Sequence, residues 1–240
     1  MSASIDWTPS KTPMYPAFLK VEDRSCLVVG GGPIAAQKTR ELVECGARVD
    51  VVSPTLDSAF DAFRDAGPGR LRWRQRAFER PDVVGRFLVL SATGDPAVDN
   101  VVYDEASTRG ILVNVVDVPD RCDWYAGAVV RSGPVTVCMG TNGASPSLSI
   151  ALRKRIERLL TPAVGHLATA LGEARPSLKR AWPDYGERAK RLNRVIDGAL
   201  DRVDALSNDD VNTLIAAVRG CDRSCDAATP CCALDALEKR

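Results

Sequence analysis

Apolar runs of strand length recur along the first half of the chain, with helical segments between them. The predicted strands are Cys26–Val29, Val49–Val52, Leu71–Gln75, Phe87–Leu90 and Ile111–Val115. Helices are predicted after the first and fourth strands, at 34–45 and 98–109. The unbroken apolar character of 87–90 is typical of a strand covered on both faces. This order predicts an α/β fold, with a parallel sheet wound by helices on both faces.

The pattern changes after Asp117. Two strand-like runs, Ala128–Arg131 and Val135–Met139, are joined by a Ser-Gly-Pro sequence and predict a hairpin or tight crossover. Ser145 and Pro146 have the residue types of a helix N-cap and first helical position. The chain therefore adds a small α+β segment to the α/β part.

The helix that begins at Pro146 is predicted to be amphipathic. Its apolar face carries Leu148, Leu152, Ile156, Leu159 and Leu160. From residue 161 to about residue 219 the chain is predicted to be helical, with breaks at Pro176, Pro183 and Gly186.

Composition adds limits on the partners. The 240 residues carry 32 basic and 31 acidic side chains, a net charge of +1, which offers no global field for nucleic acid. Basic residues are concentrated between Arg153 and Arg194. They could form a solvated helical face or a surface that binds an anionic partner. No run is long enough for a membrane helix, and 1–13 lacks a signal-peptide pattern. We expect a cytoplasmic protein without membrane or nucleic-acid partners.

The cysteines fall into two groups. Reduced core or near-core thiols are expected at Cys26, Cys45, Cys122 and Cys138. A second group, spaced C-x3-C-x5-C-C, consists of Cys221, Cys225, Cys231 and Cys232. That spacing matches no recognised zinc or iron–sulfur pattern, so we assign no metal ligands.

A glycine-rich turn follows the first predicted strand and opens the first helix. Residues 30–35 read Gly-Gly-Gly-Pro-Ile-Ala and satisfy G-x-G-x-x-A. Glycines there let the backbone approach a pyrophosphate, which the helix N-terminus stabilises. In this strand-turn-helix setting the motif predicts a Rossmann-type dinucleotide site, although a tight turn alone could also use it. Asp50 lies inside the second strand and no arginine follows Ser53, which favours NAD over NADP.

Small or polar residues end the fourth and fifth predicted strands. Residues 91–95 read Ser-Ala-Thr-Gly-Asp, and residues 114–117 read Asn-Val-Val-Asp. Ligands of parallel sheets bind at the carboxyl ends of the strands. We therefore expect Asp117 to face the nicotinamide side of the crevice, with a turn residue before Pro119 as the alternative.

These residues resemble the precorrin-2 dehydrogenase/sirohydrochlorin ferrochelatase family, the N-terminal module of siroheme synthase. The resemblance spans roughly residues 14–194. It is carried by Tyr15-Pro16, Phe18-Leu19, Val29-Gly30-Gly31-Gly32, Ala35, Lys38, Glu44-Cys45-Gly46-Ala47, Ala92-Thr93, Asn114-Val115-Val116-Asp117, Thr141-Asn142-Gly143-Ala144-Ser145-Pro146 and Leu152-Arg153.

The resemblance implies roles for specific positions. NAD contacts are implied for Gly30, Gly31, Gly32, Pro33, Ile34, Pro54, Thr55, Ala92 and Thr93. Substrate contacts are expected at Asn114, Thr141, Asn142 and Gly143. Asp117 matches the family's key aspartate, so we expect it to be catalytic. Thr141 stands where the family often has Ser, and Gly127 where it commonly has Pro.

The implied reaction is NAD-dependent oxidation of precorrin-2, a tetrapyrrole polycarboxylate, to sirohydrochlorin. Insertion of Fe²⁺ or Co²⁺ by the same protein is left open. The implied assembly is a homodimer formed through about 128–158. We accordingly divide the chain into an NAD-binding domain (14–126), a dimerisation segment (127–158), a helical domain (159–220) and a cysteine-rich tail (221–240).

Three other functions remain open from the sequence. A chelatase could retain the fold without dehydrogenase activity, although the intact glycine turn argues against this. An NAD-responsive sensor could use the basic helices to bind a macromolecule, but Asp117 would then have no purpose. A tetrapyrrole or metal carrier could use the cysteine-rich tail.

Overall fold

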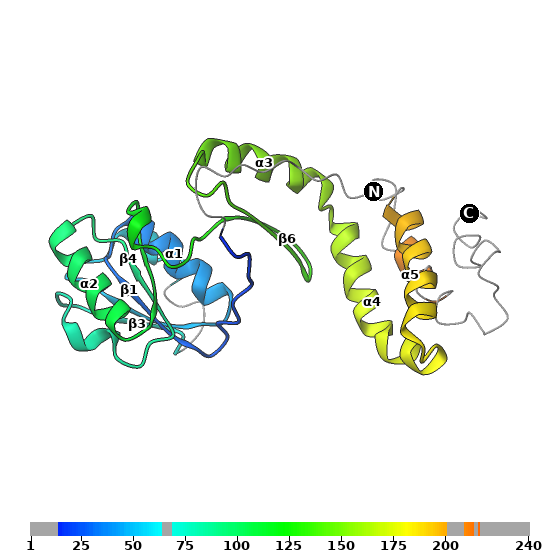
Figure 1. Ribbon diagram of the computed structural model, residues 1–240, viewed down its shortest axis with the longest axis horizontal. Coiled ribbons are helices and arrows are strands. Elements are labelled where there is room, and N and C mark those ends of the chain that lie inside the picture. Colours follow the sequence, from blue (N-terminus) through cyan, green and yellow to red (C-terminus); the bar gives the residue numbers. More distant parts are fainter. Residues whose placement is uncertain (1–13, 64–68, 201–208, 214–215, 217–240) are drawn as a thin grey trace. The chain divides into compact units, whose positions relative to one another are not determined.

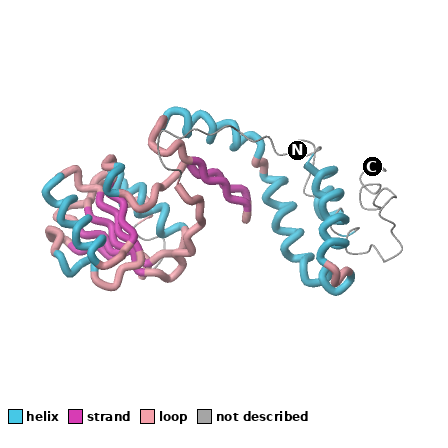
Figure 2. The backbone as a smooth tube through the Cα atoms, in the orientation of Figure 1, coloured by secondary structure: helices cyan, strands magenta, loops and turns pink. Residues whose placement is uncertain are grey.

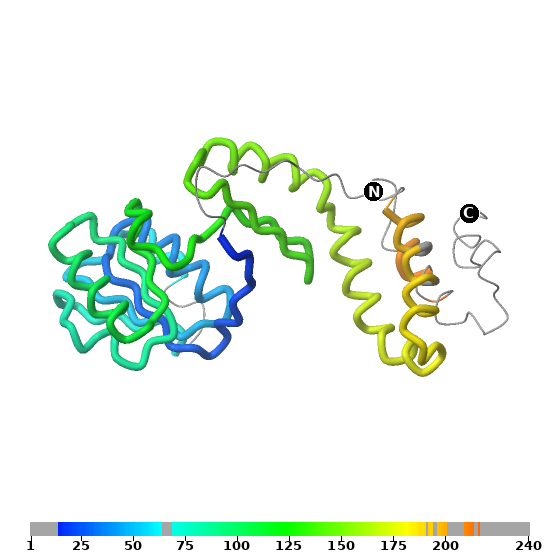
Figure 3. The backbone as a smooth tube through the Cα atoms, in the orientation of Figure 1, coloured from blue at the N-terminus to red at the C-terminus, as the bar shows by residue number. Residues whose placement is uncertain are grey.

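The computed structural model describes residues 14–63, 69–200, 209–213 and 216. The chain divides into two compact units, one ending at Ala126 and the other beginning at Gly127. Figure 3 follows the chain in order, from the blue strands of the first unit to the yellow and orange helices of the second. The finer predicted boundary near residue 158 stays a prediction, and the cysteine-rich tail lies outside the described residues.

A five-stranded sheet forms the centre of the first unit (Figures 1 and 2). Its strands are β1 (Ser25–Val29), β2 (Arg48–Val52), β3 (Leu71–Arg74), β4 (Leu88–Ser91) and β5 (Leu112–Val115). They run in the order β3-β2-β1-β4-β5, and every adjacent pair is parallel. The predicted α/β class and the parallel Rossmann-type sheet are confirmed.

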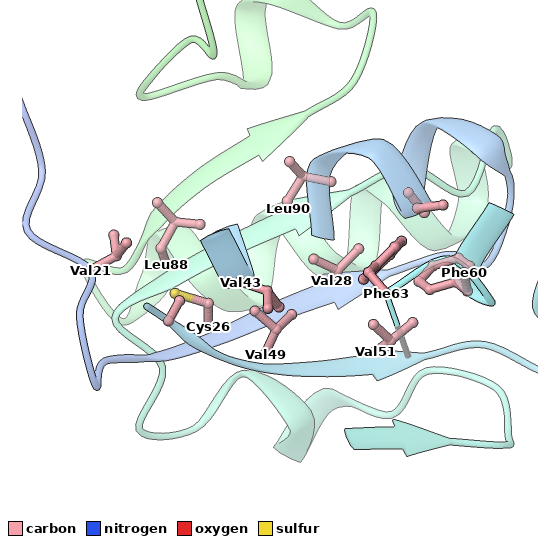
Figure 4. Close-up of a cluster of buried hydrophobic side chains, with 13 residues drawn as sticks. Val21, Cys26, Val28, Val43, Val49, Val51, Phe60, Phe63, Leu88 and Leu90 are labelled. Atoms are coloured by element: carbon pink, nitrogen blue, oxygen red, sulfur yellow. The ribbon is translucent and has the colours of Figure 1, made fainter. Parts of the chain in front are cut away.

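Two helices cover opposite faces of this sheet. The helix α1 (Pro33–Glu44) packs Ala35, Ala36 and Val43 into one buried cluster, shown in Figure 4. The helix α2 (Pro96–Thr108) packs Val102 and Ala106 into a second cluster on the other face. Successive strand residues point to opposite faces, so each strand contributes to both clusters.

On the α2 side, the β2–β3 end of the sheet carries a network of charges. The connections before and after β3 contain the 3₁₀ turns η1 (Ser58–Phe60) and η2 (Arg80–Val83). Asp50 accepts hydrogen bonds from Arg72 at 2.9 and 2.6 Å, and from Arg74 and Arg86 at 2.9 and 2.6 Å. Burial alone would raise the pKa of Asp50; hydrogen bonds from Arg72 and Arg86 outweigh burial and lower the pKa to about 2.

The second unit begins with an antiparallel hairpin. Its strands β6 (Ala128–Ser132) and β7 (Val135–Met139) confirm the predicted pair. Three helices follow: α3 (Pro146–Leu159), α4 (Pro162–Ala181) and α5 (Tyr185–Leu200). The Ser145 hydroxyl caps α3 by accepting from the amide of Leu148 at 3.2 Å, as predicted.

The hairpin turn packs closely against α4. A Cβ at Gly133 would lie 2.9 Å from the carbonyl oxygen of Gly165, and one at Gly165 would lie 2.6 Å from Ser132 Oγ. The Ser132 hydroxyl donates to the carbonyl oxygen of Thr161 at 2.7 Å. These backbone approaches tie the start of α4 to the hairpin.

Two predicted helix breaks are wrong. Pro176 lies inside α4, which continues to Ala181 because Ala174 and Leu178 on either side of it are buried. Packing of that face compensates the backbone hydrogen bond that proline removes. Gly186 lies in the first turn of α5 rather than between helices. Pro183 does lie between α4 and α5, as predicted.

The four described cysteines do not share one environment. Cys26 is buried and Cys122 is partly buried, whereas Cys45 and Cys138 are exposed. The prediction of near-core positions is therefore wrong for the exposed pair. Within the described part of the chain, no helix has the length and apolar character to cross a membrane.

Candidate dinucleotide-binding site

The glycine turn between β1 and α1 is pressed against two neighbouring loops. Gly30 has a φ of +119°, and a Cβ there would overlap the carbonyl oxygen of Ala92. A Cβ at Gly31 would overlap the carbonyl oxygen of Thr55. The amide of Gly30 also donates to the carbonyl oxygen of Val52 at 3.0 Å. The first two glycines are therefore required by the protein's own packing.

Gly32 has a different environment from the other two. A Cβ at this position would meet nothing within 4 Å. Gly32 is the N-cap of α1 and Pro33 occupies its first position, and the N-cap makes no side-chain hydrogen bond. The amides of Ile34 and Ala35 in the first turn have no acceptor within the helix, because helix geometry provides none. This open, donor-rich helix end fits the pyrophosphate of a dinucleotide.

The loop after β2 is attached to the same turn. The amide of Asp57 donates to the carbonyl oxygen of Gly31 at 2.7 Å. Pro54 and Thr55 are exposed beside this contact. The two predicted contact residues of this loop therefore lie next to the glycine turn.

An acidic residue at the end of β2 would bind the adenosine ribose, but β2 ends at Val52 and is followed by Ser53. Asp50 is 7% exposed and is held by arginines, so it is a structural carboxylate. Arg74 and Arg76 come near the end of β2 in space, since the amide of Ser53 donates to the carbonyl oxygen of Arg74 at 3.3 Å. Both guanidinium groups are already bound to carboxylates, which agrees with the preference for NAD.

The loop after β4 is organised by hydroxyl groups and a buried carboxylate. Thr93 Oγ1 donates to Asp99 Oδ1 at 2.6 Å and accepts from the amide of Asp95 at 3.0 Å. Ser91 Oγ donates to the same Asp99 oxygen at 2.6 Å. The Thr93 hydroxyl is thus committed within the protein. Contact with a cofactor would fall to the backbone of Ala92 and Thr93.

Asp117 lies in the turn that follows β5. It is exposed and has a φ of +63°, an unfavourable backbone region for a residue other than glycine. The amide of Val118 donates to the carbonyl oxygen of Val115 at 3.1 Å and closes the turn. The amide of Val116 donates to the carbonyl oxygen of Ser91 at 2.9 Å, so this turn adjoins the loop after β4.

Hydrogen bonds of Asn114 and Cys122 hold the Asp117 turn in place. Asn114 is 9% exposed and its amide nitrogen donates to the carbonyl oxygen of Trp124 at 2.8 Å and to Cys122 Sγ at 3.3 Å. The Cys122 thiol lies 3.2 Å from the carbonyl oxygen of Val115. Burial raises the pKa of Cys122, which keeps it a neutral donor. Asn114 as a substrate contact stays a prediction, because its amide donors are already used.

The predicted substrate residues 141–143 belong to the second unit. Asn142 and Gly143 have φ values of +53° and +79° and form a turn before α3. The Thr141 hydroxyl accepts from the amide of Ser145 at 3.1 Å. Their contact with substrate stays a prediction.

Two supporting residues were missed by sequence reasoning. Asp99 had a weak signal, because an acidic residue in the first turn of a helix follows two hydroxyl residues of the preceding strand and loop. Cys122 had none, because its partners are backbone carbonyls. Both act through atoms that sequence patterns do not specify.

Comparisons with known proteins point the same way. A family model described as "Putative NAD(P)-binding" matches residues 17–128. Siroheme synthase 1 of Halorhodospira halophila is 36% identical over 185 residues, covering 77% of this chain and 38% of that protein. The siroheme synthase of Methylococcus capsulatus is 38% identical over 183 residues, covering 76% of this chain and 38% of that protein. The solved structure of SirC, precorrin-2 dehydrogenase, superposes with a TM-score of 0.67 at 25% identity, covering 85% of this chain and 99% of SirC.

These matches confirm the predicted resemblance to the precorrin-2 dehydrogenase/sirohydrochlorin ferrochelatase family. The chain spans less than two-fifths of the length of the siroheme synthases that it matches. The predicted cofactor, NAD, is confirmed by the matching family model and by the likeness to SirC. The domain bounds 14–126 stay a prediction.

Proposed function

We propose that this chain oxidises precorrin-2 to sirohydrochlorin with NAD as the electron acceptor. The likeness to siroheme synthases and to SirC supports the reaction, and the open helix end at Gly32 supports the cofactor. Bound NAD supplies the hydride acceptor. The glycine turn would hold the NAD that takes the hydride from the substrate. The protein would take the proton, which completes the new conjugation.

One observation carries the assignment of the proton acceptor. Asp117 is an exposed carboxylate held at a φ of +63° beside the loop after β4. Among the described residues, no hydrogen-bond donor or cation is bound to this carboxylate, so it is free to accept a proton from substrate. The Cys122 and Asn114 contacts beneath the turn hold it in place.

The second unit supplies two further arguments. Exposed basic side chains on α3 suit a substrate with many carboxylates: Arg153, Lys154, Arg155 and Arg158. No residue of α3 is buried, and its predicted apolar face includes Leu148, 51% exposed, and Leu159, 63% exposed. We propose that this face forms a homodimer interface. The cytoplasmic location stays a prediction.

The decisive experiment is an anaerobic assay with purified protein, enzymatically generated precorrin-2 and NAD. Sirohydrochlorin and NADH should appear together in the absorbance spectrum, at equal molar amounts. A second spectral change on adding Fe²⁺ or Co²⁺ would add chelatase activity. A folded protein that binds NAD but forms no sirohydrochlorin would contradict the dehydrogenase assignment.

Replacement of the proposed proton acceptor tests the mechanism. Asp117→Ala should lower kcat about 10²- to 10⁴-fold, the usual contribution of a general base. NAD affinity should stay near that of the unchanged protein, because the glycine turn is untouched. Asp120→Ala, at an exposed position three residues later, is the matched control. Undiminished turnover by Asp117→Ala would show that another group takes the proton.

A further inference from the structure

A buried carboxylate on α2 has no place in the proposed proton transfer. Asp99 is 7% exposed and lies in the first turn of α2. Among the described residues, none of the ion pairs includes it. Its partners are the hydroxyls of Ser91 and Thr93, each at 2.6 Å. A carboxylate that is buried without a cation needs such donors to offset its lost hydration.

Both hydroxyls donate to one and the same oxygen, Asp99 Oδ1. Each hydroxyl has a single hydrogen. For Thr93, Asp99 Oδ1 at 2.6 Å is a nearer acceptor than the carbonyl oxygen of Asp95 at 3.3 Å, so the hydroxyl points to Asp99. Thr93 then offers a lone pair to the amide of Asp95, whose own carboxylate caps α2 by accepting from the amide of Ala97 at 2.9 Å. One acceptor oxygen therefore orders the whole turn between β4 and α2.

The turn between β4 and α2 packs directly against the glycine turn at Gly30. Ser91 and Thr93 flank Ala92, whose carbonyl oxygen would overlap a Cβ at Gly30. The amide of Ala92 donates to the carbonyl oxygen of Val29 at 2.8 Å, directly before Gly30. If Ala92 moved toward the glycine turn, it would therefore displace the backbone of Gly30.

We propose that Asp99 is a positioning residue for NAD, acting through Ser91 and Thr93 on the backbone of Ala92 and Gly30. The inference rests on the proposed cofactor site. It requires an acceptor oxygen at position 99 and not a negative charge, because a single oxygen receives both hydroxyls. Asparagine can supply that oxygen, and alanine cannot.

The test compares Asp99→Ala with Asp99→Asn in the full chain. NAD dissociation constants are measured by isothermal titration calorimetry, and unfolding temperatures are recorded without NAD. Asp99→Ala should raise the Kd for NAD by about tenfold or more, as expected when two hydroxyls lose their shared acceptor and the turn is no longer held. Asp99→Asn should stay within about threefold of the unchanged protein, well below that loss. In turnover, the KM for NAD should rise with Asp99→Ala while kcat at saturating NAD is largely kept.

Controls separate positioning from a loss of fold. Asp104→Ala removes an exposed carboxylate from the same helix and should leave the Kd unchanged. Should Asp99→Ala unfold, Thr93→Val removes one of the two donors and should weaken NAD binding in a folded protein. An unchanged Kd in the folded Asp99→Ala or Thr93→Val protein overturns the inference. Equal losses in Asp99→Ala and Asp99→Asn also overturn it, because the charge would then matter. Failure of the unchanged protein to bind NAD overturns the proposed function itself.

Discussion

In the first unit, β4 is buried at every residue and β1 at every residue but its first, whereas α3 in the second unit has no buried residue at all. The first unit has two apolar clusters, one on each face of its sheet. The second unit exposes Leu148, Ile150 and Leu159 on one helix. Burial of apolar surface is the main favourable contribution to folding, and α3 receives little of it from the rest of its unit, whereas α4 buries Ala174 and Leu178.

The difference indicates which part of the molecule is complete within one chain. A domain that covers both faces of its sheet can hold a rigid cofactor site without help. A helix that exposes leucines over several turns has surface to bury against another molecule. The second unit is thus where a partner would contribute.

The largest expected effect is in the core of the first unit. Leu90 on β4 is 1% exposed, and Leu90→Ala should lower the free energy of unfolding by about 2–5 kcal/mol. Leu148→Ala, at a position 51% exposed, should change it by less than about 0.5 kcal/mol in the dissociated protein. Urea unfolding at low protein concentration measures both. Comparable losses would contradict the contrast between the units.

An intermediate effect is expected from the charge network, and it depends on pH. The folded pKa of Asp50 is lowered to about 2 from an ordinary 3.8, so its ionised form stabilises the folded state. That stabilisation is complete above pH 4 and is lost as pH falls through 2; it amounts to about 2 kcal/mol.

Asp50→Asn tests this contribution. The variant should be less stable at neutral pH, and its stability should fall less steeply between pH 4 and pH 2. Thermal unfolding across that range is the measurement. Asp104→Asn, at an exposed position of the same unit, provides the comparison. If stability falls equally steeply between pH 4 and pH 2 in Asp50→Asn and in the unchanged protein, other carboxylates cause the pH dependence.

The smallest expected effect is on association. Leu159→Glu should weaken the proposed homodimer by about tenfold or more, as is typical of a disrupted interface contact. Ser147→Glu adds the same charge to another side of α3 and should weaken it much less. Sedimentation velocity over a dilution series measures the dissociation. If the unchanged protein is monomeric at every concentration, the proposed homodimer interface is wrong.

Local sequence patterns were sufficient for the elements of the first unit. The glycine turn, the strand-length apolar runs and Gly46, at the end of α1 with a φ of +84°, each lie where the sequence predicts. These features depend on neighbours only a few residues away. The predicted helix break at Pro176 was wrong for the opposite reason. Ala174 and Leu178 are buried against other elements, and this long-range packing keeps α4 continuous.

The support of the candidate site depended on long-range placement. Asp50, Arg72 and Arg86 are far apart in sequence, and parallel pairing of β2 with β3 places Asp50 opposite Arg72. Asp99 is close to Ser91 in sequence, but only the helix direction of α2 turns its carboxylate back to the strand. Neither contact has a sequence motif.

The sequence by itself determined the class of fold, the glycine turn and the position of Asp117 after the fifth strand, because periodicity, turn chemistry and strand order are local properties. Tertiary structure alone decided which carboxylates are structural and which are free. Asp50 and Asp99 are buried among donors, whereas Asp117 is exposed on a constrained turn. The three residues are chemically identical, and their roles differ because burial and hydrogen-bond partners are set by parts of the chain that meet only on folding.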